Sequence, residues 1–302
     1  ETLHLRAEGG RCLLQEAAAF FPAASRWLST WRGPERDMNR AVEASVCLAW
    51  NGCLVLVEAG RVKGVMEASM ECPGALLRGE KAFRACRALE GGGGCEGPAR
   101  AISFAQACEE ARGMKIPPAA AALRALLLEL ARAQSHLAWL ERVSLRLGRG
   151  RAAAACRELR AGIGKAVSSW LGDPLGRGWV VPGGVGEDFP LEDAAGMAAS
   201  LEGLSRRWEE LSGRTASLRA PRWMEKRLEA LRGRARETAP SGPLARALGV
   251  ETDARAEEPG VYGLLGWKMA AAEGGGGVFR ELAAVKAREV TDSLRVARRV
   301  LA

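Results

Sequence analysis

The chain has 302 residues, enough for one large domain or two small ones, and a formal net charge of +8. Arginine carries most of the positive charge, with 37 Arg against 7 Lys, which permits an anionic partner without selecting one. We find no N-terminal signal pattern and no apolar run near the ~18 residues of a membrane span. Any link to a membrane is therefore expected to come through partner subunits.

Eight cysteines are scattered along the chain, and no two stand in Cys-x-x-Cys spacing. A local zinc or cluster site would need cysteines paired at short spacing. Without a secretory signal, we expect reduced thiols that behave mostly as small buried apolar groups. The positions are Cys12, Cys47, Cys53, Cys72, Cys86, Cys95, Cys108 and Cys156.

The N-terminal part has weak patterns, apart from one hairpin. We expect residues 1–50 to form a peripheral segment, with short helices near 13–20 and 40–50, and residues 51–302 to form the main domain. In residues 53–67, two short β-branched runs lie either side of a glycine-containing turn, which predicts a β hairpin.

The stretch from residue 100 to residue 147 predicts two consecutive helices that are broken at Pro117 and Pro118. The second helix, residues 118–147, would be about 45 Å long at ~1.5 Å per residue. One of its faces is continuously apolar, which predicts a central helix inside a bundle. That face comprises Leu123, Leu126, Leu127, Leu130, Ala133, Leu137, Leu140, Val143 and Leu147.

Further helices are predicted over residues 151–171, 191–218, 221–238 and 278–302, with a long Gly/Pro loop at 172–189. The fold class is therefore predicted to be mainly α, a helical bundle with a small N-terminal β hairpin. Between residues 214 and 236 there are eight basic residues against two acidic ones, a pattern typical of a solvated helical face.

Three polar residues share one stripe of the central helix. Glu129 and Arg132 stand at i,i+3 spacing and predict a stabilising ion pair. His136 follows four residues later, and a lone histidine on a helix favours a hydrogen-bonded structural role. Nucleotide-binding motifs are missing: Gly162 to Lys165 lacks the upstream glycine and the Ser/Thr of a P-loop.

Several stretches together resemble the large subunit of nickel–iron hydrogenases. The resemblance is closer to the membrane-bound, complex I-related branch and to the quinone-pocket subunit of complex I, the respiratory NADH-quinone oxidoreductase. The order aromatic-Ala-Gln-Ala-x-Glu, Ile-Pro-Pro and Leu-Arg-x-Leu-Leu-x-Glu-Leu carries this resemblance, and the Gly/Pro loop fits it too. The stretches are Phe104–Glu109, Ile116–Pro118, Leu123–Leu140, residues 172–189 and residues 242–255. The resemblance implies a bundle of the hydrogenase large-subunit type.

The resemblance implies candidate site residues in the N-terminal half. Glu80 follows Arg78 and Gly79 where hydrogenases keep a proton-relay glutamate. The alternative is that Glu80 lies at the start of a helix, where it interacts favourably with the helix dipole or pairs with Arg78. Arg100 stands where the family has a histidine that follows its first metal-binding cysteines.

The resemblance also assigns Arg246, Asp253 and Arg255 to the interior near the site. Such a buried charge cluster either holds the shape of a cleft or performs chemistry, and the sequence leaves both open. A nickel–iron centre needs four thiolates, of which at most Cys95 remains. We therefore expect no metal site and no cofactor bound by this chain.

The function implied by the resemblance is that of a subunit of a membrane-associated redox complex related to complex I. It would pack on an iron–sulfur small subunit, which carries the cluster, and form an electron-acceptor cleft for a quinone-like oxidant. Other hydrophilic and membrane subunits would hold it on the cytoplasmic side of the membrane, and no nucleic acid is expected as a partner. The alternatives are a scaffold subunit that has lost the site, or a true hydrogenase large subunit with missing segments.

Overall fold

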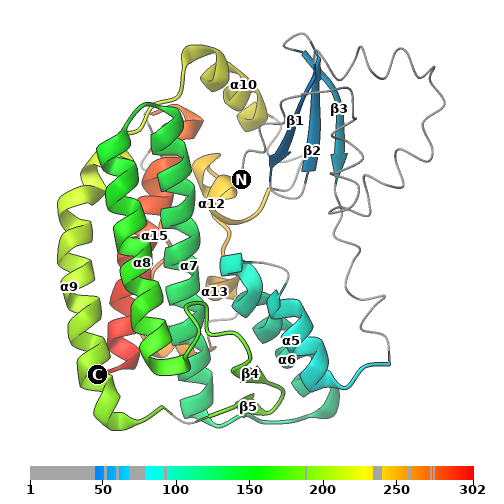
Figure 1. Cartoon of the computed structure of the whole chain (residues 1–302), viewed down its shortest axis with the longest axis vertical. Helices are drawn as coiled ribbons and strands as arrows, with labels where there is room; N and C mark the ends of the chain where they lie inside the picture. Colours follow the sequence, from blue (N-terminus) through cyan, green and yellow to red (C-terminus); the bar gives the residue numbers. More distant parts are fainter. Residues whose placement is uncertain are drawn as a thin grey trace, which may run out of the picture. The chain divides into compact units, whose positions relative to one another are not determined.

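A computed structural model of the chain (Figure 1) describes two compact units, Glu1–Gly79 and Glu80–Ala302. The described residues are 45–50, 53–58, 61–67, 79–91, 94–187, 189–233, 240–257, 260–272, 274 and 276–302. Residues 1–44, including the predicted helix near 13–20, lie outside them. The peripheral N-terminal segment therefore stays a prediction.

The first unit contains a three-stranded antiparallel sheet of order β1-β2-β3. Its strands are β1 (Ser45–Trp50), β2 (Cys53–Glu58) and β3 (Arg61–Glu67). Glu58 lies opposite Arg61, which confirms the predicted hairpin. The helix predicted near 40–50 is wrong over residues 45–50, because this segment is a strand that pairs along its whole length with β2. Strand pairing here overrides a weak local preference for helix.

The second unit is almost entirely helical, which confirms the mainly α fold class. Two short strands form a small antiparallel hairpin inside the predicted Gly/Pro loop. The elements are α5 (Ala82–Gly91), η1 (Gly94–Glu96), α6 (Gly97–Arg112), α7 (Pro118–Arg146), α8 (Gly150–Leu171), β4 (Val180–Val181), β5 (Gly184–Val185), α9 (Leu191–Ala216), α10 (Arg222–Gly233), α12 (Gly242–Ala247), α13 (Ala254–Glu257), α14 (Gly260–Leu264) and α15 (Val278–Val300).

Helix α7 is the predicted central helix, unbroken for 29 residues. It begins at Pro118, where a missing N–H leaves no helical bond unmade. The preceding helix α6 ends at Gly113, whose φ of 61° places it in the left-handed region that favours glycine at this position. Leu126, Leu130 and Leu137 on α7 are fully buried. The apolar face therefore forms the core of the bundle, as the sequence predicts.

The other three long helices pack around α7, side by side in Figure 1. Helices α8 and α15 contact α7 directly, and α9 closes the bundle against both of them. Trp208 of α9 is 1% exposed and donates its indole N–H to Thr291 Oγ1 of α15 at 3.0 Å. The short helices α12 and α14 lie against α15 and α7, respectively. Their polar residues therefore reach the interior.

Among the described helices, none combines the length and the apolar character that crossing a membrane requires.

We predict that Leu137→Ala lowers the free energy of unfolding by about 2–5 kcal/mol, because it opens a cavity in the core that the neighbouring helices cannot close. Leu145→Ala on the same helix is the matched control, since Leu145 is 51% exposed and its replacement should change stability by less than about 0.5 kcal/mol. Chemical denaturation measures both. Equal losses for the two variants would contradict the central position of α7.

Candidate functional site: a buried charge cluster

Charged and polar side chains from five helices and one connecting segment meet inside the bundle. We call this group the charge cluster. It contains Glu129, Arg132, His136, Arg246, Asp253, Arg255, Tyr262, Lys286, Glu289 and Ser293. Ionised groups are rarely buried without partners, because desolvation penalises their charge. Each carboxylate of the cluster accordingly has at least one cationic partner.

Glu129 of α7 is the deepest carboxylate, with no exposed surface. Its Oε1 accepts hydrogen bonds from the Arg255 guanidinium at 3.1 Å and from the Tyr262 hydroxyl at 2.9 Å, and its Oε2 accepts one from the Ser293 hydroxyl at 2.5 Å. Burial would raise the pKa of Glu129, but Arg132 and Arg255 outweigh it and hold the pKa below its usual range. The Glu129 carboxyl group is therefore ionised. Its predicted ion pair with Arg132 is confirmed, at 3.3 Å.

Glu289 of α15 joins three other helices. It accepts hydrogen bonds from Arg246 of α12, from Arg255 of α13 at 3.3 Å, and from His136 Nε2 of α7 at 2.5 Å. Burial would raise its pKa, but the His136 hydrogen bond and the charge of Arg246 outweigh burial and hold the pKa at about 2. This carboxylate stays ionised throughout the physiological pH range.

His136 lies between an acid and a base. Burial lowers its pKa to about 4, although the bond to Glu289 opposes the shift, so the ring is neutral near pH 7. Its Nε2–H donates to Glu289, and Nδ1 accepts from the Lys286 ammonium at 3.3 Å. Burial also lowers the pKa of Lys286 to about 8. The neutral imidazole of His136 thus accepts a hydrogen bond at one nitrogen and donates one at the other, which connects Lys286 to Glu289.

The structure brings together the three candidates Arg246, Asp253 and Arg255. The Asp253 carboxylate accepts from Arg246 at 2.9 Å and from Arg255 at 2.8 Å, and all three side chains are buried. Burial acts to raise the pKa of Asp253, but the hydrogen bonds from Arg255 outweigh it and lower the pKa. Arg255 also lies over the Trp267 ring, 4.3 Å from its centroid.

The structure places Glu80 and Arg100 apart from this cluster. Glu80 is exposed just before α5 and forms an i,i+4 ion pair with Arg84 at 3.8 Å. Arg100 is in the first turns of α6 and donates to Glu96 at 3.4 Å, near the surface. A catalytic role for either residue stays a prediction, and neither shares a hydrogen bond with the charge cluster among the described residues.

A second buried ion pair lies nearer the N-terminus of α7. Arg124 forms a bidentate pair with Glu109 of α6, at 2.6 and 3.0 Å. Arg124 also donates to the carbonyl oxygens of Val181 and Gly184, and Glu109 accepts from the Gly183 N–H at 2.7 Å. Gly183 has a φ of 98°, which favours glycine. We call this arrangement the loop clamp, because it fixes the β4–β5 hairpin to the bundle.

Sequence reasoning missed Glu289, Lys286 and Ser293 on α15. A signal was available in the sequence, because Val285, Glu289 and Ser293 follow each other at i,i+4 spacing. An acidic residue therefore lies on the same face of the helix as Val285, and all three residues are buried. Glu90 was missed as well. It is 2% exposed, burial raises its pKa, and its Oε2 accepts from the Gly178 N–H at 2.5 Å.

The described cysteines do not fit a nickel–iron centre. Cys86, Cys95, Cys108 and Cys156 are free thiols. Burial raises the pKa of Cys95, which disfavours the thiolate form that binds metal. In the described part of the chain, no three His, Cys, Asp or Glu side chains are grouped so that they could hold a metal ion.

The fold and the charge cluster define a helical-bundle subunit with ionised groups at its centre. Residues 148–302, just over half of the chain, match the family described as respiratory-chain NADH dehydrogenase, 49 kDa subunit, and the chain belongs to this family. The predicted resemblance to the complex I-related branch is thereby confirmed.

A solved structure supports the same fold. It is described as the membrane-bound sulfane sulfur reductase, an archaeal respiratory membrane complex, and one of its chains aligns with a TM-score of 0.67. The alignment covers 83% of this chain and 69% of that chain at 21% sequence identity, a likeness that shows the fold alone. A search of curated proteins found no match.

We predict that Glu289→Gln destabilises the protein by about 3–5 kcal/mol near pH 7, because Arg246 and Arg255 keep their buried charge and lose a partner. Because the pKa of Glu289 is lower in the folded protein than its ordinary value of 4.5, the ionised carboxylate stabilises the fold fully above about pH 4.5. This stabilisation is lost as the pH falls toward about 2. The difference between variant and wild type should therefore narrow below about pH 4.5.

Urea unfolding at a series of pH values measures this difference. Asp292→Asn on the same helix is the control, because Asp292 pairs with Arg295 at a partly exposed position and its loss should change stability by only about 0–1 kcal/mol. An E289Q variant as stable as wild type at neutral pH would show that Glu289 is not the ionised centre of the cluster.

Proposed function

We propose that this chain is a subunit of a membrane-associated, multi-subunit redox complex related to complex I and to membrane-bound hydrogenases. The observation that carries the proposal is the family match over residues 148–302. The region of the match contains every member of the charge cluster except Glu129, Arg132 and His136, which α7 contributes.

In this proposal the chain packs on an iron–sulfur small subunit and forms one wall of an electron-acceptor cleft. The clusters that deliver electrons belong to the partner, since the described thiols do not fit a metal centre. The acceptor is a quinone or a similar small oxidant, and partner subunits hold the chain on the cytoplasmic side of the membrane.

The charge cluster supplies the proton chemistry that such an acceptor needs. A quinone that takes up two electrons also takes up two protons to become a quinol. Lys286 suits the first step, because its pKa of about 8 lets it hold a proton at neutral pH and release it readily. His136 connects Lys286 to Glu289, and the fixed charges of Arg246 and Arg255 hold Glu289 as an anion.

The alternative is a scaffold subunit that keeps the fold without the chemistry. The exposed positions of Glu80 and Arg100, away from the charge cluster, favour it. In that case the charge cluster only fixes the packing of α12 and α13 on the bundle. A hydrogenase with a nickel–iron site is a third interpretation, and metal analysis addresses it directly.

We predict that the chain, purified from its native membranes, is accompanied by an iron–sulfur small subunit and by integral membrane subunits. Iron and acid-labile sulfide in the preparation, together with an EPR signal after reduction, measure the first partner, and mass spectrometry identifies the others. Purification of the chain alone and free of iron would overturn the proposal, whereas one equivalent of nickel would support the hydrogenase alternative.

We further predict that Lys286→Met lowers quinone-analogue reduction by the purified complex about 10²-fold or more, as expected when a positioned proton donor is lost. Methionine keeps an unbranched apolar side chain and removes the ammonium, which lies 5.4 Å from the centroid of the Trp139 ring. The wild-type rate should fall as the pH rises through about 8, and the variant should lose this dependence.

Asp292→Asn is again the control, because it removes a charge from the same helix outside the charge cluster. Assembly of each variant is checked by its iron content. A K286M complex that assembles and turns over like wild type at every pH would favour the scaffold.

A further inference from the structure

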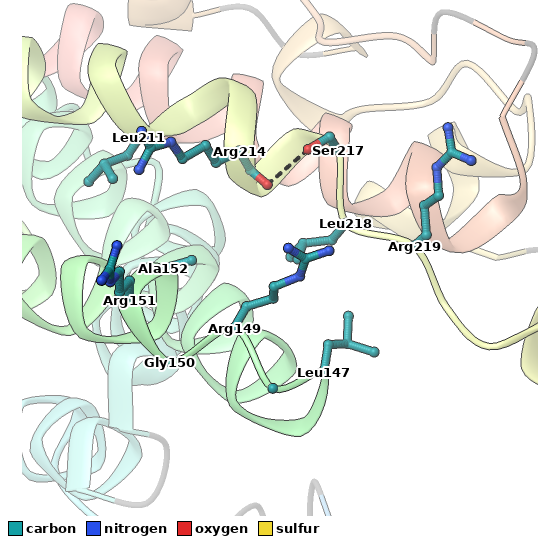
Figure 2. A pocket seen from close by; sticks show the side chains of 11 residues that line it. Leu147, Arg149, Gly150, Arg151, Ala152, Leu211, Arg214, Ser217, Leu218 and Arg219 are labelled. Atoms are coloured by element: carbon teal, nitrogen blue, oxygen red, sulfur yellow. Dashed lines mark hydrogen bonds between the residues drawn. The ribbon is translucent and has the colours of Figure 1, made fainter.

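A cavity of about 710 Å³ lies at one end of the helix bundle, outside the charge cluster. It is bounded by the turn between α7 and α8 on one side, and by the end of α9 with the segment after it on the other (Figure 2). This volume lies in the range of protein pockets that bind small organic molecules. The lining residues are Leu147, Gly148, Arg149, Gly150, Arg151, Ala152, Leu211, Arg214, Ser217, Leu218 and Arg219.

Four arginines and no acidic residue line this cavity: Arg149, Arg151, Arg214 and Arg219. None of their guanidinium groups forms an ion pair or a hydrogen bond with another described residue. Arg157 and Arg160 on the same helix α8, by contrast, both form ion pairs with Glu141. Like charges repel where they gather in a hollow, so an anion that binds there relieves this repulsion.

The backbone adds to the positive potential. Helix α8 has 22 residues and begins at Gly150, and its N-cap residue Arg149 provides no side-chain cap. The first N–H groups of a helix lack acceptors within the helix, and the helix dipole is positive at this end. Figure 2 shows the Arg149 side chain reaching from the turn toward Leu218. Two independent sources of positive potential therefore meet at the cavity.

Part of the wall is apolar. Leu218 is 5% exposed, and Leu147 and Leu211 are half-buried beside it. A bare inorganic ion would leave much of this volume unfilled. The lining fits a molecule with a compact, strongly charged head and an apolar part.

We propose that this cavity binds a phosphate ester, with the phosphate near the N-terminus of α8 and the four arginines of the lining supplying positive charge around it. Arginine suits this chemistry, because its planar fork donates two parallel hydrogen bonds to phosphate oxygens. The concave form favours a compact anion over an acidic peptide, whose charges are spread along a chain. The phosphate ester is either a soluble organic phosphate or the headgroup of an anionic phospholipid.

Two probes separate these sources on the full chain purified with its partners. Pyrophosphate is titrated in a calorimeter. Vesicles of phosphatidylcholine with phosphatidylglycerol are sedimented with the protein, next to vesicles of phosphatidylcholine alone. The variants are R149Q/R151Q and R214Q/R219Q. They alter two different segments, so that a folding failure in one leaves the other as a test.

We expect each double variant to weaken binding about tenfold or more, since each removes two of the four positive charges that line the cavity. The control R112Q/R206Q removes the same net charge from exposed positions outside the cavity and should change binding less than about twofold. Cavity-dependent binding of pyrophosphate supports a soluble ligand, and cavity-dependent binding of anionic vesicles supports a lipid headgroup.

Three results would overturn the proposal. One is a control that loses as much affinity as the cavity variants, because net charge alone would then explain binding. Another is the absence of binding to both probes. The third is cavity-dependent binding of poly-glutamate that is tighter than binding of either phosphate probe, which would assign the cavity to an acidic protein partner.

Discussion

The carboxylate of Glu289 ties together parts of the chain that are far apart in sequence. It accepts from His136 on the central helix and from Arg246 and Arg255 on the short helices α12 and α13. Short helices have little stability of their own, so their position depends on tertiary contacts. Here those contacts are ionic and lie in the interior, where leaving one partner alone is costly. The same carboxylate therefore organises the packing and places the ionisable groups.

The sequence predicts the long elements well, because their signals are local. The apolar face of α7 and the two prolines before it are enough to place that helix. The strand Ser45–Trp50 could not be predicted in this way, since its conformation comes from pairing with β2. The residues of the candidate site likewise divide into those that a sequence motif identifies and those that only tertiary contacts bring together. Motif spacing identified Arg246, Asp253 and Arg255, whereas Glu289 joins them only through tertiary contacts, which link it to Arg246 and Arg255 and, across 153 residues, to His136.

The family match and the described cysteines bear on two different properties of the chain, its fold and its capacity to bind metal. The match to the 49 kDa subunit family of respiratory-chain NADH dehydrogenase covers residues 148–302, which include three of the four long helices, α8, α9 and α15. The described cysteines, by contrast, are free thiols, and burial raises the pKa of Cys95. An arginine–carboxylate interior can survive the loss of metal ligands, because its own ion pairs maintain it.

The loop clamp has a consequence for selectivity at the β4–β5 hairpin. All three guanidinium nitrogens of Arg124 already have acceptors within the protein, namely the Glu109 carboxylate and the carbonyl oxygens of Val181 and Gly184. Only the Nη1 group has an N–H beyond those with a described acceptor, and moving the guanidinium would leave the Glu109 carboxylate without its partner in the interior. An anion that approaches residues 180–185 therefore gains little from the charge of Arg124, because Glu109 already neutralises it.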